Sequence, residues 1–231
     1  MLVSPDDPAG RLAYHYAEKV RIAAAAAATV NDGETVMIEA GSCCALLAEQ
    51  ISIQRTGITI VTNSAFIAQR LGAHPMVSTV LLGGEQQHDS RVLVGPMVEL
   101  CARQFIVDRL FIGTDGFTPS LGFTARDYMR ATAVRALASR AERVVVLTES
   151  EKLGGHGPVP LLGADDVAAL WTDSAAPDAQ VDALTGAGVE VVTVAADGTA
   201  AVHPAQARPE PDHVVGRDSG PTALTTREEP S

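Results

Sequence analysis

Short apolar strands alternate with helices through most of the 231-residue chain, and this alternation limits the fold more than any other feature. The segments that we predict as strands are rich in β-branched residues and almost continuously apolar, which is typical of strands covered on both faces. Strands of this kind alternate with helices in proteins whose central sheet is mostly parallel. The sequence therefore predicts a three-layer α/β fold, a mostly parallel sheet with helices on both faces.

The predicted elements follow one another in a regular order. We expect strands at Thr35–Glu39, Ile58–Val61, Ser78–Leu82, Arg109–Ile112, Arg143–Leu147, Ala168–Trp171 and Glu190–Val194. We expect helices at Leu12–Val30, Ser42–Ile51, Ala65–Leu71, Gly95–Gln104, Tyr128–Ala141 and Pro177–Ala187. Residues 91–94 offer a further, antiparallel strand, so the order of strands in the sheet is left open.

The two ends of the chain differ from its middle. Residues 196–231 hold five of the thirteen prolines and no aromatic residue. Such a segment cannot bury enough apolar surface to offset the entropy lost on ordering. We therefore predict a disordered tail over residues 196–231, one folded domain over residues 17–195 and a short lead-in over residues 1–16.

The formal net charge of −11 argues against nucleic acid as a direct partner. Proteins that hold the DNA backbone present clustered Lys and Arg side chains and gain affinity by releasing counterions. The sequence has no such cluster. We therefore expect no direct DNA binding by this chain alone.

Neither a metal, a cofactor nor a membrane is indicated by the sequence. The three cysteines, Cys43, Cys44 and Cys101, lack C-x-x-C spacing, and the six histidines lack the H-E-x-x-H pattern of a metal site. No apolar run approaches the ~20 residues of a membrane span, and residues 1–10 lack the features of a signal peptide. We expect a cytoplasmic protein without a metal or cofactor.

The candidate binding residues follow five of the predicted strands. In open α/β sheets, ligands bind just beyond the carboxyl ends of the strands, so the residues at these positions are the informative ones. They are small, polar or glycine in each case, which predicts one binding site at this edge of the sheet. In chain order they are Glu39, Gly41, Ser42 and Cys43, then Thr62, Asn63 and Ser64, then Gly83 and Gly84, then Asp115, Gly116 and Thr124, and finally Lys152.

Each of these loops also has a purely structural interpretation. The Gly41–Ser42 pair opens a helix whose free N–H groups and dipole suit a phosphate, but Ser42 is equally explained as an ordinary N-cap. Ser64, which also precedes a helix, is likewise either part of a phosphate site or an N-cap. Asp115 is placed either to bind sugar hydroxyls or to form an Asx turn. Lys152 supplies either a point charge for a phosphate or a plain surface lysine.

The order of these motifs resembles the C-terminal effector-binding domain of DeoR-type transcriptional regulators. The resemblance covers about residues 17–195, and its motifs are Glu18-Lys19, Asn31-Asp32-Gly33, Gly41-Ser42, Thr62-Asn63-Ser64, Gly83-Gly84, Gly95, Asp115-Gly116, Gly122-Phe123-Thr124, Lys152 and Trp171-Thr172-Asp173. It implies a fold related to ribose-5-phosphate isomerase, a phosphorylated sugar as the effector, and a homo-oligomer.

The chain departs from the family pattern at three site positions and at its start. The family usually has Asp at position 39, Thr at position 43 and Ser at position 151, where this chain has Glu39, Cys43 and Glu151. Glu151 adds negative charge beside the expected phosphate site. Members of the family carry a winged helix-turn-helix domain before the sensor. We expect that residues 1–16 are a remnant of the linker to that domain.

Three functions are compatible with the sequence. The first is a sensor whose occupancy shifts the conformation of an oligomer and hence the operator affinity of the intact regulator. The second is a sugar-phosphate isomerase or related enzyme on the same fold, with Glu85 or Asp115 as general base. The third is an interaction subunit whose pocket no longer binds a ligand. The sensor without enzymatic activity is our prediction.

Overall fold

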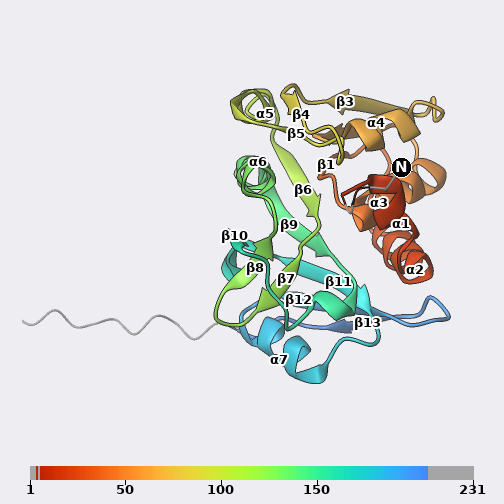
Figure 1. Cartoon of the computed structure of the whole chain (residues 1–231). Helices are drawn as coiled ribbons and strands as arrows, with labels where there is room; N and C mark the ends of the chain where they lie inside the picture. Colours follow the sequence, from red (N-terminus) through yellow and green to blue (C-terminus); the bar gives the residue numbers. More distant parts are fainter. Residues whose placement is uncertain (1–3, 5, 208–231) are drawn as a thin grey trace, which may run out of the picture.

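Eight strands form one sheet through the middle of the molecule (Figure 1). In spatial order they are β13 (Ala200–His203), β12 (Glu190–Val194), β11 (Ala169–Asp173), β9 (Ala141–Leu147), β6 (Val107–Ile112), β1 (Thr35–Ile38), β2 (Ile58–Thr62) and β3 (Val77–Leu81). Neighbouring strands are parallel except β12 and β13, which are antiparallel. This computed structural model describes residues 4 and 6–207. The predicted α/β fold with a mostly parallel sheet is confirmed.

Helices cover both faces of this sheet. They are α1 (Pro8–Ala13), α2 (Tyr16–Ala27), α3 (Ser42–Gln54), α4 (Ala65–Leu71), α5 (Pro96–Ala102), α6 (Tyr128–Ala138) and α7 (Asp178–Gly186), with short 3₁₀ turns at Ser150–Lys152 and Ala164–Asp166. Figure 1 shows α2 and α3 on one side of the sheet and α5 and α6 on the other. The three layers that the sequence predicts are therefore present.

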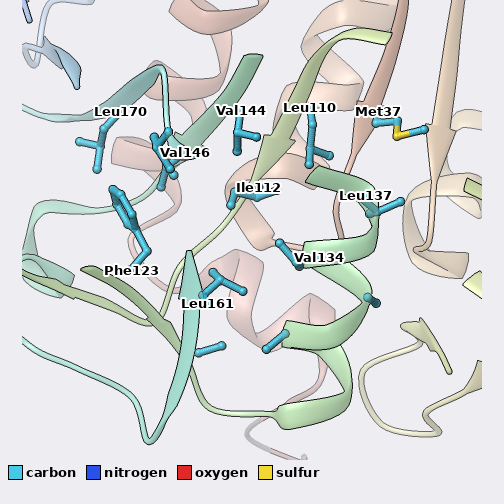
Figure 2. Close-up of a cluster of buried hydrophobic side chains, with 14 of the residues drawn as sticks. Met37, Leu110, Ile112, Phe123, Val134, Leu137, Val144, Val146, Leu161 and Leu170 are labelled. Atoms are coloured by element: carbon cyan, nitrogen blue, oxygen red, sulfur yellow. The ribbon is translucent and has the colours of Figure 1, made fainter. Parts of the chain in front are cut away.

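Each face of the sheet has its own apolar core, because successive residues of a strand point to opposite faces. In β1, Val36 and Ile38 join the core under α2, α3 and α4, whereas Met37 joins the core under α5, α6 and α7. Figure 2 shows the second core, in which Val134 and Leu137 of α6 pack over Leu110 and neighbouring strand residues.

Two small sheets lie beside the large one. Strands β4 (Glu85–Gln86) and β5 (Leu93–Val94) form an antiparallel pair. The further strand that residues 91–94 offer is thus present, but it lies outside the main sheet. Strands β7 (Gly116–Thr118), β8 (Gly122–Ala125) and β10 (Val159–Leu162) form a three-stranded sheet.

The predicted helix over Leu12–Val30 is wrong at its start, since the chain forms two helices there. His15 adopts a left-handed backbone conformation with φ of 49°, and α2 begins after it. The break has a specific cause. The buried ammonium group of Lys19 donates to the carbonyl oxygens of Arg11, at 2.6 Å, and Tyr14, at 2.5 Å. The high helix propensity of the alanine run therefore favours α2 but does not join it to α1.

The prediction of a disordered tail is wrong for its first residues. Residues 200–203 form β13, which pairs with β12 from Val191↔His203 to Val194↔Ala200. The hydrogen bonds that β12 offers at the sheet edge order this segment, although its side chains are mostly exposed. The rest of the predicted tail, residues 208–231, lies outside the described residues.

Candidate functional site

A polar pocket opens at the carboxyl ends of three adjacent central strands, β1, β6 and β9. Its cavity is small, about 40 Å³, and about 520 Å³ of empty space lies within its walls when the open mouth is included. Six of the residues predicted from the sequence line it, together with several that were not predicted. The predicted ones are Glu39, Gly41, Ser42, Cys43, Asp115 and Lys152. We call this the central pocket.

The first turn of α3 faces the central pocket without a side-chain cap. Gly41, not Ser42, is the N-cap residue, and no side chain in the described part of the chain caps this helix. The interpretation of Ser42 as an ordinary N-cap is therefore wrong: it is the first residue of α3, partly exposed, and it lines the pocket. Ser42 and the positive end of the helix dipole therefore border the same pocket, and a helix N-terminus favours an anion.

Gly41 allows the loops after β1 and β6 to approach each other. A Cβ atom at position 41 would lie 3.3 Å from the Cα atom of Gly113 and 3.3 Å from Glu39 Oε2. Such contacts are tighter than ordinary packing, so a side chain here would push the two loops apart. The glycine thus keeps the floor of the pocket narrow.

Glu39 is a buried carboxyl group at this floor. Its Oε2 atom accepts a hydrogen bond from the N–H group of Gly113 at 3.2 Å. Burial raises the pKa of Glu39, and the Gly113 N–H group and the charges of Arg11 and Arg130 oppose this rise only in part. Glu39 is thus a hydrogen-bonding group held at the pocket without a direct ion-pair partner among the described residues.

Lys152 enters the pocket from the short turn after β9, where it is tied to a buried carboxylate. Its Nζ atom lies 3.1 Å from Oε2 of Glu149, whose other oxygen lies 2.9 Å from Lys19 Nζ. Burial alone would raise the pKa of Glu149, but the charge of Lys152 and the hydrogen bond and charge of Lys19 lower it to about 2. The interpretation of Lys152 as a plain surface lysine is wrong, since its side chain is 23% exposed and lines the pocket.

Cys43 completes this end of the pocket. Its thiol donates to Glu149 Oε2 over 3.8 Å. Burial and the nearby carboxylate raise its pKa to about 12, so the thiol stays neutral and unreactive. Cys43 therefore contributes a small apolar wall and a weak donor where the family usually has the hydroxyl of Thr.

Asp115 lines the pocket from the loop after β6. Its Oδ2 atom accepts from the backbone N–H group of Arg126 at 2.9 Å, and Asp115 is partly exposed to the pocket. The second general-base candidate of the isomerase hypothesis, Glu85, is exposed in β4 and does not line the central pocket. Only one of the two candidates is therefore near the pocket.

The loops after β2 and β3 do not reach the central pocket, because the β4–β5 hairpin occupies that end of the sheet. Asn63 Nδ2 donates to the carbonyl of Leu93 at 3.2 Å. Ser64 is the N-cap of α4, with its hydroxyl accepting from Ile67 N at 3.2 Å. A Cβ atom at Gly84 would lie 2.7 Å from the carbonyl oxygen of Val94.

The remaining predicted residues make structural contacts. Thr62 Oγ1 accepts from Ser64 N at 3.1 Å, and Gly83 faces the thiol of Cys101. Gly116 has no room for a side chain against the backbone of residues 155–156. Thr124 donates to the Gly116 carbonyl at 3.2 Å and accepts from Gly157 N at 2.8 Å.

Sequence reasoning missed four charged residues of the region. Arg11, Asp127 and Arg130 line the central pocket, and Lys19 lies behind it on Glu149. Arg11 belongs to the segment that the sequence marks only as a lead-in, so no local signal points to it. Lys19 is part of the Glu18-Lys19 motif of the resemblance, which was the one available signal.

Glu151, which adds charge where the family has Ser, turns away from Lys152. Its Oε2 atom lies 3.1 Å from His15 Nε2 and 3.3 Å from the hydroxyl of Tyr14, at the junction of α1 and α2. Its negative charge therefore acts on the rim of the site.

Within the described residues, no helix is long and apolar enough to cross a membrane, and no group of three or more His, Cys, Asp or Glu side chains is arranged to hold a metal ion.

The fold and the pocket define an α/β domain whose polar cavity lies at the carboxyl ends of the central strands. The family model for the DeoR C terminal sensor domain matches residues 14–174. This match spans more than half of the chain, and the chain belongs to this family of sensor domains. The resemblance predicted from the sequence is thereby confirmed.

Two relatives with assigned names are similar over most of the chain. The HTH-type transcriptional regulator UlaR of Shigella dysenteriae is 30% identical over 187 residues, which cover 79% of this chain and 71% of UlaR. The transcriptional repressor AccR of Agrobacterium fabrum is 28% identical over 174 residues, covering 74% and 67%. Both are named as regulators of transcription and neither as an enzyme.

Among solved structures, ribose 5-phosphate isomerase from Plasmodium falciparum is similar with a TM-score of 0.46 and 10% identity. The match covers 80% of this chain and 97% of that one.

Proposed function

We propose that this domain senses a phosphorylated sugar and thereby controls the DNA binding of the regulator to which it belongs. The observation that carries the proposal is the convergence of the uncapped first turn of α3 and the ammonium group of Lys152 in one pocket. A helix N-terminus and a lysine are both favourable partners of a phosphate.

The rest of the pocket suits the sugar. Glu39 and Asp115 present carboxyl oxygens on facing loops, after β1 and β6, where they can accept hydrogen bonds from hydroxyl groups. The loops after β2 and β3, with Thr62, Asn63, Ser64, Gly83 and Gly84, then support the site from behind. Gly116 and Thr124 do the same for the loop that carries Asp115.

The direct test is a thermal-shift screen against a panel of sugar phosphates, since a ligand that binds the native state raises its apparent stability by RT ln(1 + [L]/Kd). Ser42→Asp should abolish the shift, because it places a negative charge at the first turn of α3. Asp is well accepted in the first turn of a helix, so the fold should survive. Ala179→Asp, which adds the same charge at an exposed position in the first turn of α7, is the matched control. An unaltered shift in the Ser42 variant would place the phosphate elsewhere.

An isomerase remains the alternative function, and Asp115 is the residue that supports it. Ketose formation from the tightest-binding aldose phosphate is the test. We expect no turnover. Turnover of even ~1 per second that is lost in Asp115→Asn would replace the sensor by an enzyme.

The proposed sensor acts in the cytoplasm as a homo-oligomer, and its effector changes the arrangement of the subunits. Light scattering with and without the effector would measure the oligomeric state. The chain alone should not bind operator DNA, because its net charge is −11. Nanomolar binding of duplex DNA at ~150 mM salt would contradict this.

A further inference from the structure

Helix α1 covers the start of α3, and Arg11 is the residue that α1 brings to the site. Arg11 lines the central pocket and two adjoining hollows. One is an outer cleft bordered by Tyr14 and Glu151, and the other is a crevice bordered by Phe66. Among the residues that the structure describes, Ser42 is the only other one that lines all three. Arg11 and the first turn of α3 therefore border the same space.

The guanidinium group of Arg11 has free hydrogen-bonding capacity. It is partly buried, and no hydrogen bond or ion pair of its side chain occurs within the described residues. Arg130, by contrast, donates to Gln87 Oε1 at 2.8 Å and lies 3.6 Å from Asp6. A guanidinium group has five donors in a planar fork that matches phosphate oxygens. All the side-chain donors of Arg11 are thus available to a ligand, whereas part of the Arg130 guanidinium group is already bound by Gln87.

The backbone of Arg11 is fixed by the same buried charges that hold Lys152. Lys19 Nζ donates to the Arg11 carbonyl oxygen at 2.6 Å and lies 2.9 Å from Glu149, which also binds Lys152. No residue of α1 is fully buried, and Leu12 is its one partly buried residue packed against the apolar core, so these hydrogen bonds matter for its attachment. The carboxylate of Glu149 therefore helps to position both residues, Lys152 directly and Arg11 through Lys19.

We propose that Arg11 is a ligand-binding residue that, with Lys152 and the first turn of α3, encloses the dianionic group of a phosphate monoester. The proposal rests on the proposed function and narrows it. Two cationic side chains and a helix N-terminus match two negative charges, so a monoester is preferred over a singly charged phosphodiester. Because Arg11 contributes from α1, the bound phosphate also joins α1 to α3.

The test is an NMR titration with two small probes, methyl phosphate as the dianion and dimethyl phosphate as the monoanion. The wild-type protein should bind methyl phosphate at least tenfold more tightly than dimethyl phosphate. Arg11→Met should weaken methyl phosphate binding by roughly tenfold to hundredfold, the range of a charge-assisted hydrogen bond, and reduce the preference. Arg11→Lys should restore part of the affinity. Arg103→Met removes an equal charge from an exposed site on α5 and should change nothing.

Amide hydrogen exchange over residues 8–14 separates a ligand contact from a structural role. Methyl phosphate should slow this exchange in the wild-type protein but not in Arg11→Met, while the two free proteins should exchange alike. Faster exchange in the free Arg11→Met protein would show that Arg11 only holds α1 in place, and the proposed contact would be wrong.

The outcomes distinguish this inference from the function on which it rests. If the wild-type protein binds methyl phosphate and Arg11→Met binds it equally well, Arg11 is not a ligand residue, although the sensor function stands. If the wild-type protein binds neither methyl phosphate nor any sugar phosphate of the panel, both proposals fail.

Discussion

The ammonium group of Lys19 lies 2.9 Å from Oε1 of Glu149, and both side chains are almost fully buried. Lys19 also donates to two backbone carbonyls of the N-terminal segment, and Glu149 also pairs with Lys152 of the central pocket. The attraction within a buried ion pair offsets the cost of desolvating its charges only when their remaining hydrogen bonds are satisfied, as they are here. The pair thus joins the N-terminal segment to the pocket.

Lys19→Met should strongly destabilise the protein. The change leaves Glu149 with one cationic partner and leaves the carbonyls of Arg11 and Tyr14 without their donor, so we expect a loss of ~3–5 kcal/mol in the free energy of unfolding. Urea denaturation at pH 7 measures it. The double variant Lys19→Met/Glu149→Gln should lose less than the sum of the two single changes. Strict additivity would show that the two side chains do not interact.

Stability should fall in acid because of Glu149. Its folded-state pKa of about 2 lies below its ordinary value of 4.5, so its contribution is complete above pH 4.5 and is lost as the pH falls toward 2. Denaturation of the wild-type protein and of Glu149→Gln across this range tests the assignment. The difference between the two should shrink as the pH falls from 4.5 to 2. A difference that stays constant would contradict the depressed pKa.

Lys152→Ala should weaken sugar-phosphate binding by roughly tenfold to hundredfold, since a hydrogen bond to a charged group contributes ~1.5–3 kcal/mol. Lys152→Arg should not restore it fully, because the forked guanidinium is larger than the ammonium group. Isothermal titration calorimetry with the best ligand of the panel gives both values. Unchanged affinity in Lys152→Ala would mean that Lys152 stays bound to Glu149 and that the phosphate depends on Arg11 and α3.

The end of the chain gives a pair of matched truncations. Ending the chain after Ala195 removes β13 and should lower Tm by roughly 4–8 °C, equivalent to about 2 kcal/mol for a domain of this size. Ending it after Ala207 should leave Tm within error, because residues 208–231 are rich in proline and charge. Calorimetry distinguishes the two. Equal Tm values for both truncations would show that β13 adds no stability.

Local patterns in the sequence were sufficient for the elements of the core. The strand over Thr35–Glu39 and the alanine-rich part of the helix over Leu12–Val30 were predicted because β-branched and alanine preferences act within a few residues. The same patterns placed six residues of the central pocket after strands, namely Glu39, Gly41, Ser42, Cys43, Asp115 and Lys152. The carboxyl ends of parallel strands lie at the same edge of a sheet whatever the order of the strands, so a binding site at that edge could be predicted.

The tertiary structure alone decided which of these loops meet. The order β9-β6-β1 brings Lys152, Asp115 and Ser42 together, whereas the β4–β5 hairpin occupies the space beside Asn63. It also decided that α1 turns back over α3 and delivers Arg11, because that turn depends on hydrogen bonds from a buried lysine to carbonyls five and eight residues earlier. Such bonds form only when Glu149, 130 residues further along, holds the lysine in place. Contacts over this separation depend on the packed sheet, and no local pattern encodes them.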